Sequence, residues 1–286
     1  MKRWYAILVV VLLSVASLGC LDSPEEEGAT ESVESATQTG IGGSETIEET
    51  EETLVDAEPE EEQEQEETQD VQVSLYDRSE ITTAEEAWAE LMKGNERYVA
   101  GESAVKDLVS RRNETVSAQH PFVTVVTCSD SRVSPELLFD QGIGDIFVIR
   151  TAGNVVRDPS VLGSIEYGVE HLQTPLLLIL GHQSCGAVTA AVEGEAEGNI
   201  GSILEEIKPA VDTAKDTGKE DHELIEEAVN ENVGLVIQNA LNGSSVVNEL
   251  VENGDLKIIG AKYFLDSGKV EIIEQLPAEE GSESGE

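Results

Sequence analysis

Three short apolar runs in the middle of the chain show no alternation of apolar and polar residues. They are residues 122–127, 146–149 and 176–180. Strands buried on both faces of a parallel sheet have this pattern, because both sides of each strand contact apolar neighbours. A helical pattern over residues 160–172 separates the second run from the third. We therefore expect an α/β fold with a mainly parallel central β-sheet flanked by helices.

Helical and strand patterns continue on both sides of these runs. Thr82 and Thr83 stand three residues before a pair of glutamates, which is the spacing of a capping box. A helix is expected to begin there and to end at Gly94 or Gly101. After residue 201 the pattern is mainly helical, and residues 257–264 and 269–273 have the pattern of a closing hairpin.

Composition changes sharply at both ends of this region. Residues 21–80 carry 22 of the 59 acidic residues but one of the 17 basic ones, and the last residues have a similar character. Such stretches cannot bury enough apolar surface to offset the entropy lost on ordering. We therefore expect a disordered acidic linker over 21–80, a folded domain over 81–275 and an acidic tail over 276–286.

The formal net charge of −42 bears on the choice of partners. A chain this acidic repels phosphate backbones, so nucleic acid is excluded as a partner. The charge is typical of a highly soluble surface, and adaptation to high salt remains an alternative.

Residues 1–20 have the pattern of an export signal. Lys2 and Arg3 precede an apolar run, and the segment ends at Gly19 and Cys20. A small residue followed by cysteine after such a run resembles a lipoprotein processing site, where the cysteine is lipidated and becomes the mature N-terminus. We expect an exported protein anchored through Cys20 to the outer face of the cytoplasmic membrane. An uncleaved N-terminal anchor is the alternative.

The other two cysteines follow buried runs. Cys128 closes the first run, and His182 and Cys185 come directly after the third. Functional sites in open α/β sheets collect at the carboxyl ends of the strands. Two thiolates and an imidazole form a zinc ligand set, and three protein ligands leave one tetrahedral position open, as in catalytic sites. The pattern predicts one catalytic Zn²⁺ per subunit.

Asp130 and Arg132 stand two residues apart just after Cys128. On an extended segment their side chains would point the same way, and arginine can hold a carboxylate through two hydrogen bonds. Asp130 could then accept a hydrogen bond from a zinc-bound water and direct the hydroxide at an electrophile. Released by Arg132, it could bind zinc and stop the reaction. A plain buried ion pair is the alternative.

Together these motifs resemble those of the β-class carbonic anhydrases, over roughly residues 82–275. The resemblance implies the same three zinc ligands, with Asp130 and Arg132 as the catalytic dyad. It also implies a substrate pocket lined by Gln119, Phe147 and Tyr167, with a backbone N–H from Gly153. The family completes this pocket across a dimer interface, so we expect a homodimer or a larger assembly.

The resemblance implies reversible hydration of CO₂ to bicarbonate and a proton. Zinc lowers the pKa of a bound water to about 7, which supplies hydroxide at neutral pH. Hydrolysis of COS or CS₂ with the same metal set is an alternative, as is a non-catalytic zinc- or bicarbonate-binding lipoprotein. A redox role is disfavoured because the two cysteines lack Cys-x-x-Cys spacing.

This chain departs from the usual family pattern at positions that are not ligands. Thr151 replaces an asparagine, and Gln183 stands where threonine or serine is frequent. Val126 stands where a bicarbonate-inhibited branch of the family has tryptophan, which favours the branch whose zinc keeps its water at neutral pH. Three histidines are conceivable proton shuttles, and none is singled out: His120, His171 and His222.

Overall fold

The structure is a computed structural model that describes residues 81–194, 196 and 198–276. The predicted signal segment and acidic linker, and residues 277–286 of the predicted tail, lie outside the described residues. None of the helices in the described ranges is long and apolar enough to cross a membrane.

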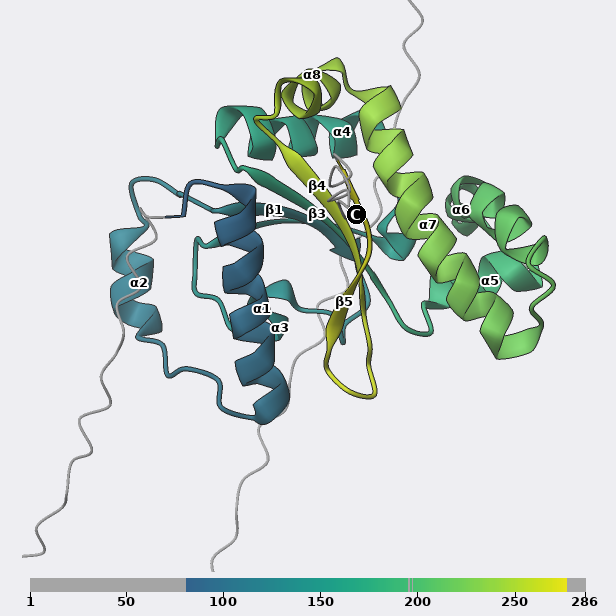
Figure 1. Cartoon of the computed structure of the whole chain (residues 1–286), viewed down its shortest axis with the longest axis horizontal. Coiled ribbons are helices and arrows are strands. Elements are labelled where there is room, and N and C mark those ends of the chain that lie inside the picture. Colours follow the sequence, from purple (N-terminus) through teal and green to yellow (C-terminus); the bar gives the residue numbers. More distant parts are fainter. Residues whose placement is uncertain (1–80, 195, 197, 277–286) are drawn as a thin grey trace, which may run out of the picture. The chain divides into compact units, whose positions relative to one another are not determined.

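A five-stranded sheet lies at the centre of the domain, in the order β2-β1-β3-β4-β5 (Figure 1). Neighbouring strands are parallel from β2 to β4, and β5 pairs antiparallel with β4. The strands are β1 (Val123–Cys128), β2 (Ile146–Thr151), β3 (Leu176–His182), β4 (Lys257–Tyr263) and β5 (Val270–Leu276). All of β1 and β3 is buried. The predicted α/β fold, its mainly parallel sheet and its closing hairpin are confirmed.

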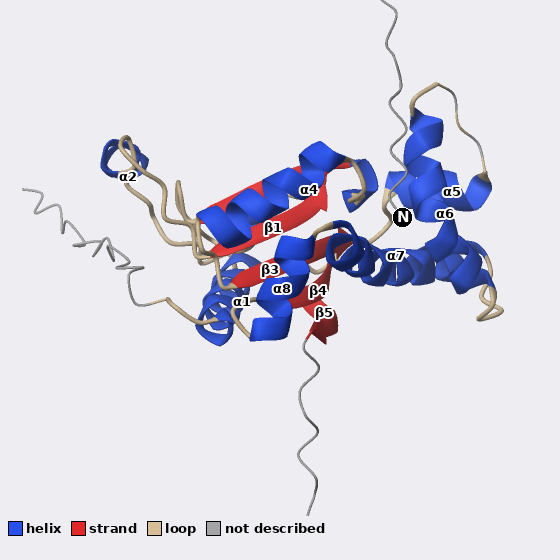
Figure 2. Ribbon diagram, turned by 90° about the horizontal axis from the view of Figure 1, so that it is seen from above, coloured by secondary structure: helices blue, strands red, loops and turns tan. Residues whose placement is uncertain are grey.

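Helices cover both faces of the sheet (Figure 2). The helices of the described residues are α1 (Ala84–Ala100), α2 (Leu108–Glu114), α3 (Pro135–Leu138), α4 (Pro159–Glu166), α5 (Gly186–Glu193), α6 (Ile200–Lys215), α7 (Asp221–Gly243) and α8 (Ser245–Asn253). A 3₁₀ turn, η2 (Ala152–Asn154), follows β2, and a π-helical turn, η3 (Tyr167–His171), extends α4. Along β3, Leu178 packs with residues of α1, whereas Leu177 and Ile179 pack with residues of α7. This alternation gives the domain one apolar core on each face of the sheet.

Helix α1 begins where the sequence predicts. The Thr83 hydroxyl accepts a hydrogen bond from the Glu86 N–H at 3.2 Å, and the Glu86 carboxylate accepts one from the Thr83 N–H at 3.1 Å. The helix passes through Gly94 and ends at Gly101, whose φ of 73° favours glycine. A Cβ on Gly94 would lie 1.7 Å from the carbonyl oxygen of Phe139. Gly94 is therefore a point of close packing rather than a helix end.

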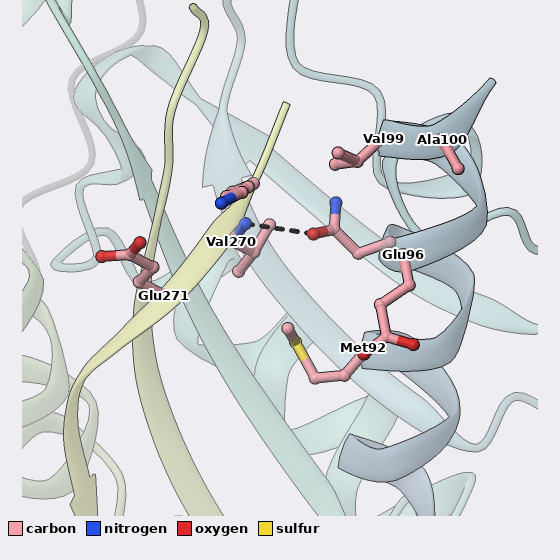
Figure 3. A pocket seen from close by; sticks show the side chains of 8 residues that line it. Met92, Glu96, Val99, Ala100, Val270 and Glu271 are labelled. Carbon is pink, nitrogen blue, oxygen red and sulfur yellow. Dashed lines mark hydrogen bonds between the residues drawn. The ribbon is translucent and has the colours of Figure 1, made fainter. Parts of the chain in front are cut away.

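Asn95 joins α1 to the hairpin formed by β4 and β5. Its side-chain NH₂ donates to the carbonyl oxygens of Leu138 at 3.1 Å and Gly268 at 2.8 Å. Its side-chain oxygen accepts from the Val270 N–H at 3.1 Å (Figure 3). A cavity of about 390 Å³ lies beside this contact, between α1 and β5. The described residues that line it include none of the predicted site residues.

Candidate metal centre

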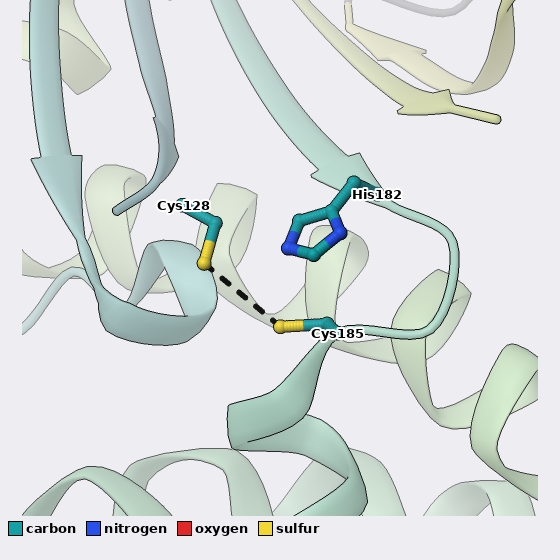
Figure 4. Close-up of side chains that lie close together, drawn as sticks. All are labelled: Cys128, His182 and Cys185. Carbon is teal, nitrogen blue, oxygen red and sulfur yellow. Dashed lines mark hydrogen bonds between the residues drawn. The ribbon is translucent and has the colours of Figure 1, made fainter. Parts of the chain in front are cut away.

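The three predicted metal ligands lie together at one edge of the sheet (Figure 4). Cys128 ends β1, His182 ends β3, and Cys185 directly precedes α5. Because β1 and β3 are parallel neighbours, their carboxyl ends open on the same side. All three residues are buried, and their ligand atoms lie within 4.8 Å of one another.

The three donors fit a zinc ion. The sulfurs of Cys128 and Cys185 are 4.0 Å apart, and two thiolates on one tetrahedral zinc lie about 3.8 Å apart. His182 Nδ1 is 3.0 Å from the carbonyl oxygen of Gln183, and Nε2 is buried with no hydrogen-bond partner among the described residues. When Nδ1 donates to that carbonyl, Nε2 keeps a free lone pair for a metal. The predicted cofactor, zinc, therefore fits this donor set.

Without a metal, the pKa values of the two thiols shift in opposite directions. A hydrogen bond from Cys185 lowers the pKa of Cys128 to about 4, and the Gly153 N–H also donates to the Cys128 sulfur, at 3.3 Å. The hydrogen bond with Cys128, together with burial, raises the pKa of Cys185. Metal binding must therefore displace the proton that Cys185 retains.

Asp130 and Arg132 pair as predicted, but through a turn. Arg132 Nε and Nη2 donate to the two carboxylate oxygens at 2.9 and 2.7 Å, and the Arg132 N–H donates to Oδ1 at 2.9 Å. The Val133 N–H donates to the Asp130 carbonyl at 3.0 Å, which closes a turn over residues 130–133. The expected extended backbone is therefore wrong, because these local hydrogen bonds stabilise the turn.

The Asp130 carboxylate borders the metal ligands. Its Oδ2 lies 3.9 Å from His182 Nε2. Hydrogen bonds from the Arg132 side chain hold the pKa of Asp130 well below its usual range, although burial opposes this effect. The Asp130 side chain is 17% exposed and that of Arg132 is 56% exposed, so the pair is not the buried ion pair of the alternative interpretation.

Three further residues contact this site, and the sequence reasoning missed them. Arg150 donates to the carbonyl oxygens of Asp130 at 2.7 Å and Cys128 at 3.2 Å. Two polar residues of α7, Glu226 and Asn232, also contact the loops that carry the ligands. In the sequence, these residues stand out only as polar residues that interrupt or directly follow an apolar pattern.

Within a single chain, the four residues assigned to a substrate pocket do not lie together around the metal centre. Gly153 lies at the metal centre, where its N–H donates to the Cys128 sulfur. Phe147 pairs with Thr124, four residues before Cys128 on β1, which is ~13 Å along a strand. The rings of Phe147 and Tyr167 are 5.9 Å apart, and Gln119 is exposed ahead of β1. Their role in a pocket stays a prediction.

The sequence is similar to proteins of one enzyme family. The sequence model of that family, carbonic anhydrase, matches residues 123–270. Carbonic anhydrase 2 of Mycobacterium tuberculosis is 38% identical over 197 residues, which cover 66% of this chain and 93% of that protein. The carbonic anhydrase of Mycolicibacterium smegmatis is 40% identical over 196 residues, with coverage of 66% and 93%.

Solved structures of β-carbonic anhydrases have a similar fold. The Coccomyxa enzyme in complex with acetazolamide is 28% identical, with a TM-score of 0.54 over 65% of this chain and 86% of that one. The enzyme CafA of Aspergillus fumigatus is 26% identical, with a TM-score of 0.55 over 65% and 90%. The sequence and fold comparisons therefore agree.

Proposed function

This chain belongs to the β-class carbonic anhydrases, zinc enzymes that hydrate CO₂, and we propose how its own residues perform the reaction. Cys128, His182 and Cys185 hold the metal. The proposal rests above all on the meeting of these three buried donors within 4.8 Å, at the ends of neighbouring strands. Bound there, zinc supplies a nucleophile at neutral pH by lowering the pKa of a water molecule to about 7.

Asp130 orients this nucleophile. Its carboxylate is ionised at neutral pH, so it accepts a hydrogen bond from the water through a lone pair that Arg132 leaves free. That hydrogen bond fixes the direction of attack on CO₂. Arg132 restrains the carboxylate through two hydrogen bonds, and without them Asp130 would compete for the open position of the metal.

A second copy of the chain completes the substrate pocket. Phe147 and Tyr167 lie far from the ligands of their own chain, which supports a pocket shared between subunits. The apolar face of α2 also supports a dimer, because Leu108 and Val109 are 54% and 60% exposed. Adjacent large apolar side chains on a surface helix often mark a contact site. In this homodimer, Gln119, Phe147 and Tyr167 line the pocket, with Gly153 beside the metal.

The enzyme works outside the cytoplasm, anchored to the outer face of the cytoplasmic membrane by a lipid on Cys20. The basic start, the apolar run and the Gly19-Cys20 pair support this location. The acidic stretch of residues 21–80 then separates the catalytic domain from the membrane.

Stopped-flow measurement of CO₂ hydration by the zinc-loaded full chain tests the activity. We expect a rate far above that of buffer, lost on chelation and restored by zinc. A Cys128→Ser/Cys185→Ser variant, which lacks two of the three ligands, is the inactive control. A chain that holds one zinc and gives no rate above buffer would refute the proposal. COS and CS₂ hydrolysis in the same sample would then favour the alternative activity.

A further inference from the structure

Helix α7 packs unusually close to the strand that carries His182. It begins near α5 and α6 and runs beside the sheet toward α8 (Figure 1). A Cβ on Gly181 of β3, or on Gly260 of β4, would lie 2.7 Å from a methyl group of Val233. Only glycine permits this approach at both positions. The position of α7 relative to the end of β3 is therefore fixed by direct contact.

One residue of α7, Glu226, holds the loop between His182 and Cys185. Its Oε1 accepts a hydrogen bond from the Ser184 N–H at 2.8 Å. Ser184 has a φ of 53°, in the left-handed region that serine rarely adopts, so the loop needs an external contact to keep this shape. Glu226 is in turn fixed by Lys262, whose Nζ lies 2.6 Å from Oε2 and whose side chain is 6% exposed.

A second residue of α7, Asn232, holds the turn beside Cys128. Its Nδ2 donates to the Gly153 carbonyl oxygen at 2.9 Å, and the residue is 1% exposed. Gly153 has a φ of 67°, and its N–H is the donor to the Cys128 sulfur. A Cβ on Gly153 would lie 2.7 Å from Ile207 Cδ1, so the turn is packed as well as hydrogen-bonded.

We propose that α7 braces the metal centre, with Glu226 and Asn232 as positioning residues for its two ligand-bearing loops. Glu226 sets the loop of His182 and Cys185, and Asn232 sets the turn that contacts the Cys128 sulfur. The two residues stand six apart on one rigid helix, so the two halves of the site are held at a fixed separation. Loss of such outer contacts typically costs 10–100-fold in metal affinity or activity. This inference rests on the proposed zinc site.

Matched variants of the full chain test the brace. Glu226→Leu/Lys262→Met and Glu226→Gln/Lys262→Met both remove the charge pair, and only the second keeps an acceptor for the Ser184 N–H. Asn232→Leu removes the donor to Gly153. Val236→Ala is the control for Asn232→Leu. Val236 lies on the same helix in a core cluster that includes no residue of either loop, so this variant opens a cavity away from the metal centre.

Two readouts report on the metal without using CO₂. The first is the rate of zinc transfer to a chelator, and the second is the electronic spectrum of the cobalt-substituted protein. We expect Glu226→Leu/Lys262→Met to release zinc at least tenfold faster than its glutamine counterpart, and Asn232→Leu at least tenfold faster than Val236→Ala. Cobalt bands should shift in both leucine variants. Equal release rates and superimposable spectra within each pair would overturn the proposal.

A measurement on the unmodified chain covers the case in which a leucine variant does not fold. The brace acts without metal, so its two donors, the backbone amide of Ser184 and the side-chain amide of Asn232, should resist hydrogen exchange in the zinc-free protein. Unprotected exchange at both amides would refute the brace. A chain that retains zinc as expected but does not hydrate CO₂ would instead refute the proposed function and leave the brace standing.

Discussion

Both carboxylate oxygens of Asp130 accept hydrogen bonds from the Arg132 side chain, at 2.9 and 2.7 Å. These donors lower the pKa of the carboxyl group, so it is ionised across the neutral range and can only accept hydrogen bonds. A group whose pKa is lowered gains a proton only below its usual titration range near 4. Between pH 6 and 9, activity should therefore rise with pH as the metal-bound water ionises, with no second step from Asp130.

The residue-scale prediction concerns Asp130→Asn. The amide has the same shape, but its NH₂ group cannot accept a hydrogen bond from the water, and its repulsion of Arg132 disturbs the pair. We expect one zinc per chain, as in the wild type, and a fall in kcat/KM on the order of a hundredfold. Metal analysis and stopped-flow hydration measure the two quantities. Full activity in a zinc-loaded variant would show that Asp130 does not orient the nucleophile.

At the scale of elements, α2 differs from the helices that pack on the sheet, because none of its own residues is buried. Its cap is satisfied, because the Asp107 carboxylate accepts from the N–H groups of Val109 and Ser110. Yet α2 has seven residues and, in the part of the chain that the structure describes, buries none of them. So short a helix is marginal without packing. A contact with a second copy would supply that packing.

The element-scale prediction is that Leu108→Ser/Val109→Ser dissociates the proposed dimer. The monomer should still fold, because neither side chain contributes to the core of its own chain. CO₂ hydration should fall at least tenfold, since each pocket would lose its partner residues. Ile200→Ser, at an exposed apolar residue of α6, should stay dimeric and active. Sedimentation analysis gives the mass, and a variant that remains dimeric would place the interface elsewhere.

At the scale of the whole molecule, the acidic charge and the N-terminal pattern bear on where the protein is located and what it can bind, and they do not affect the chemistry at the metal centre. A net charge of −42 favours solubility of the folded domain and repels anionic polymers. Lys2 and Arg3 are the only basic residues among the first twenty, ahead of the apolar run. One acyl chain gives only marginal membrane binding, so the proposed anchor on Cys20 would require more than one chain.

The whole-molecule prediction is therefore a lipid-modified Cys20. Produced in a bacterial host that processes lipoproteins, the chain should begin at Cys20, carry more than one acyl chain and sediment with membranes. Mass spectrometry of the N-terminal peptide measures this directly. Cys20→Ser should abolish the modification and leave CO₂ hydration by the purified protein unchanged. A native chain that keeps Met1 would support the uncleaved anchor instead.

The sequence by itself determined the kind of sheet, the start of α1 and the three residues whose donor atoms meet at the candidate metal centre. Each of these depends on local information. Runs without alternation identify buried strands, and Thr83 and Glu86 satisfy each other within one helical turn. Cys128, His182 and Cys185 lie at or just after the ends of two strands, and in a parallel sheet these ends lie on the same side.

Only the tertiary structure decided which distant atoms meet. Gly94 continues α1 because its backbone lies against the Phe139 carbonyl, and no local pattern contains that contact. Asn232 contacts Gly153 from 79 residues away, and Glu226 contacts Ser184 from 42 residues away. Such contacts depend on how a helix docks on a sheet, which the packing of many side chains fixes together. The sequence therefore names the candidate metal ligands, and the docking of α7 places Glu226 and Asn232 against the loops that carry them.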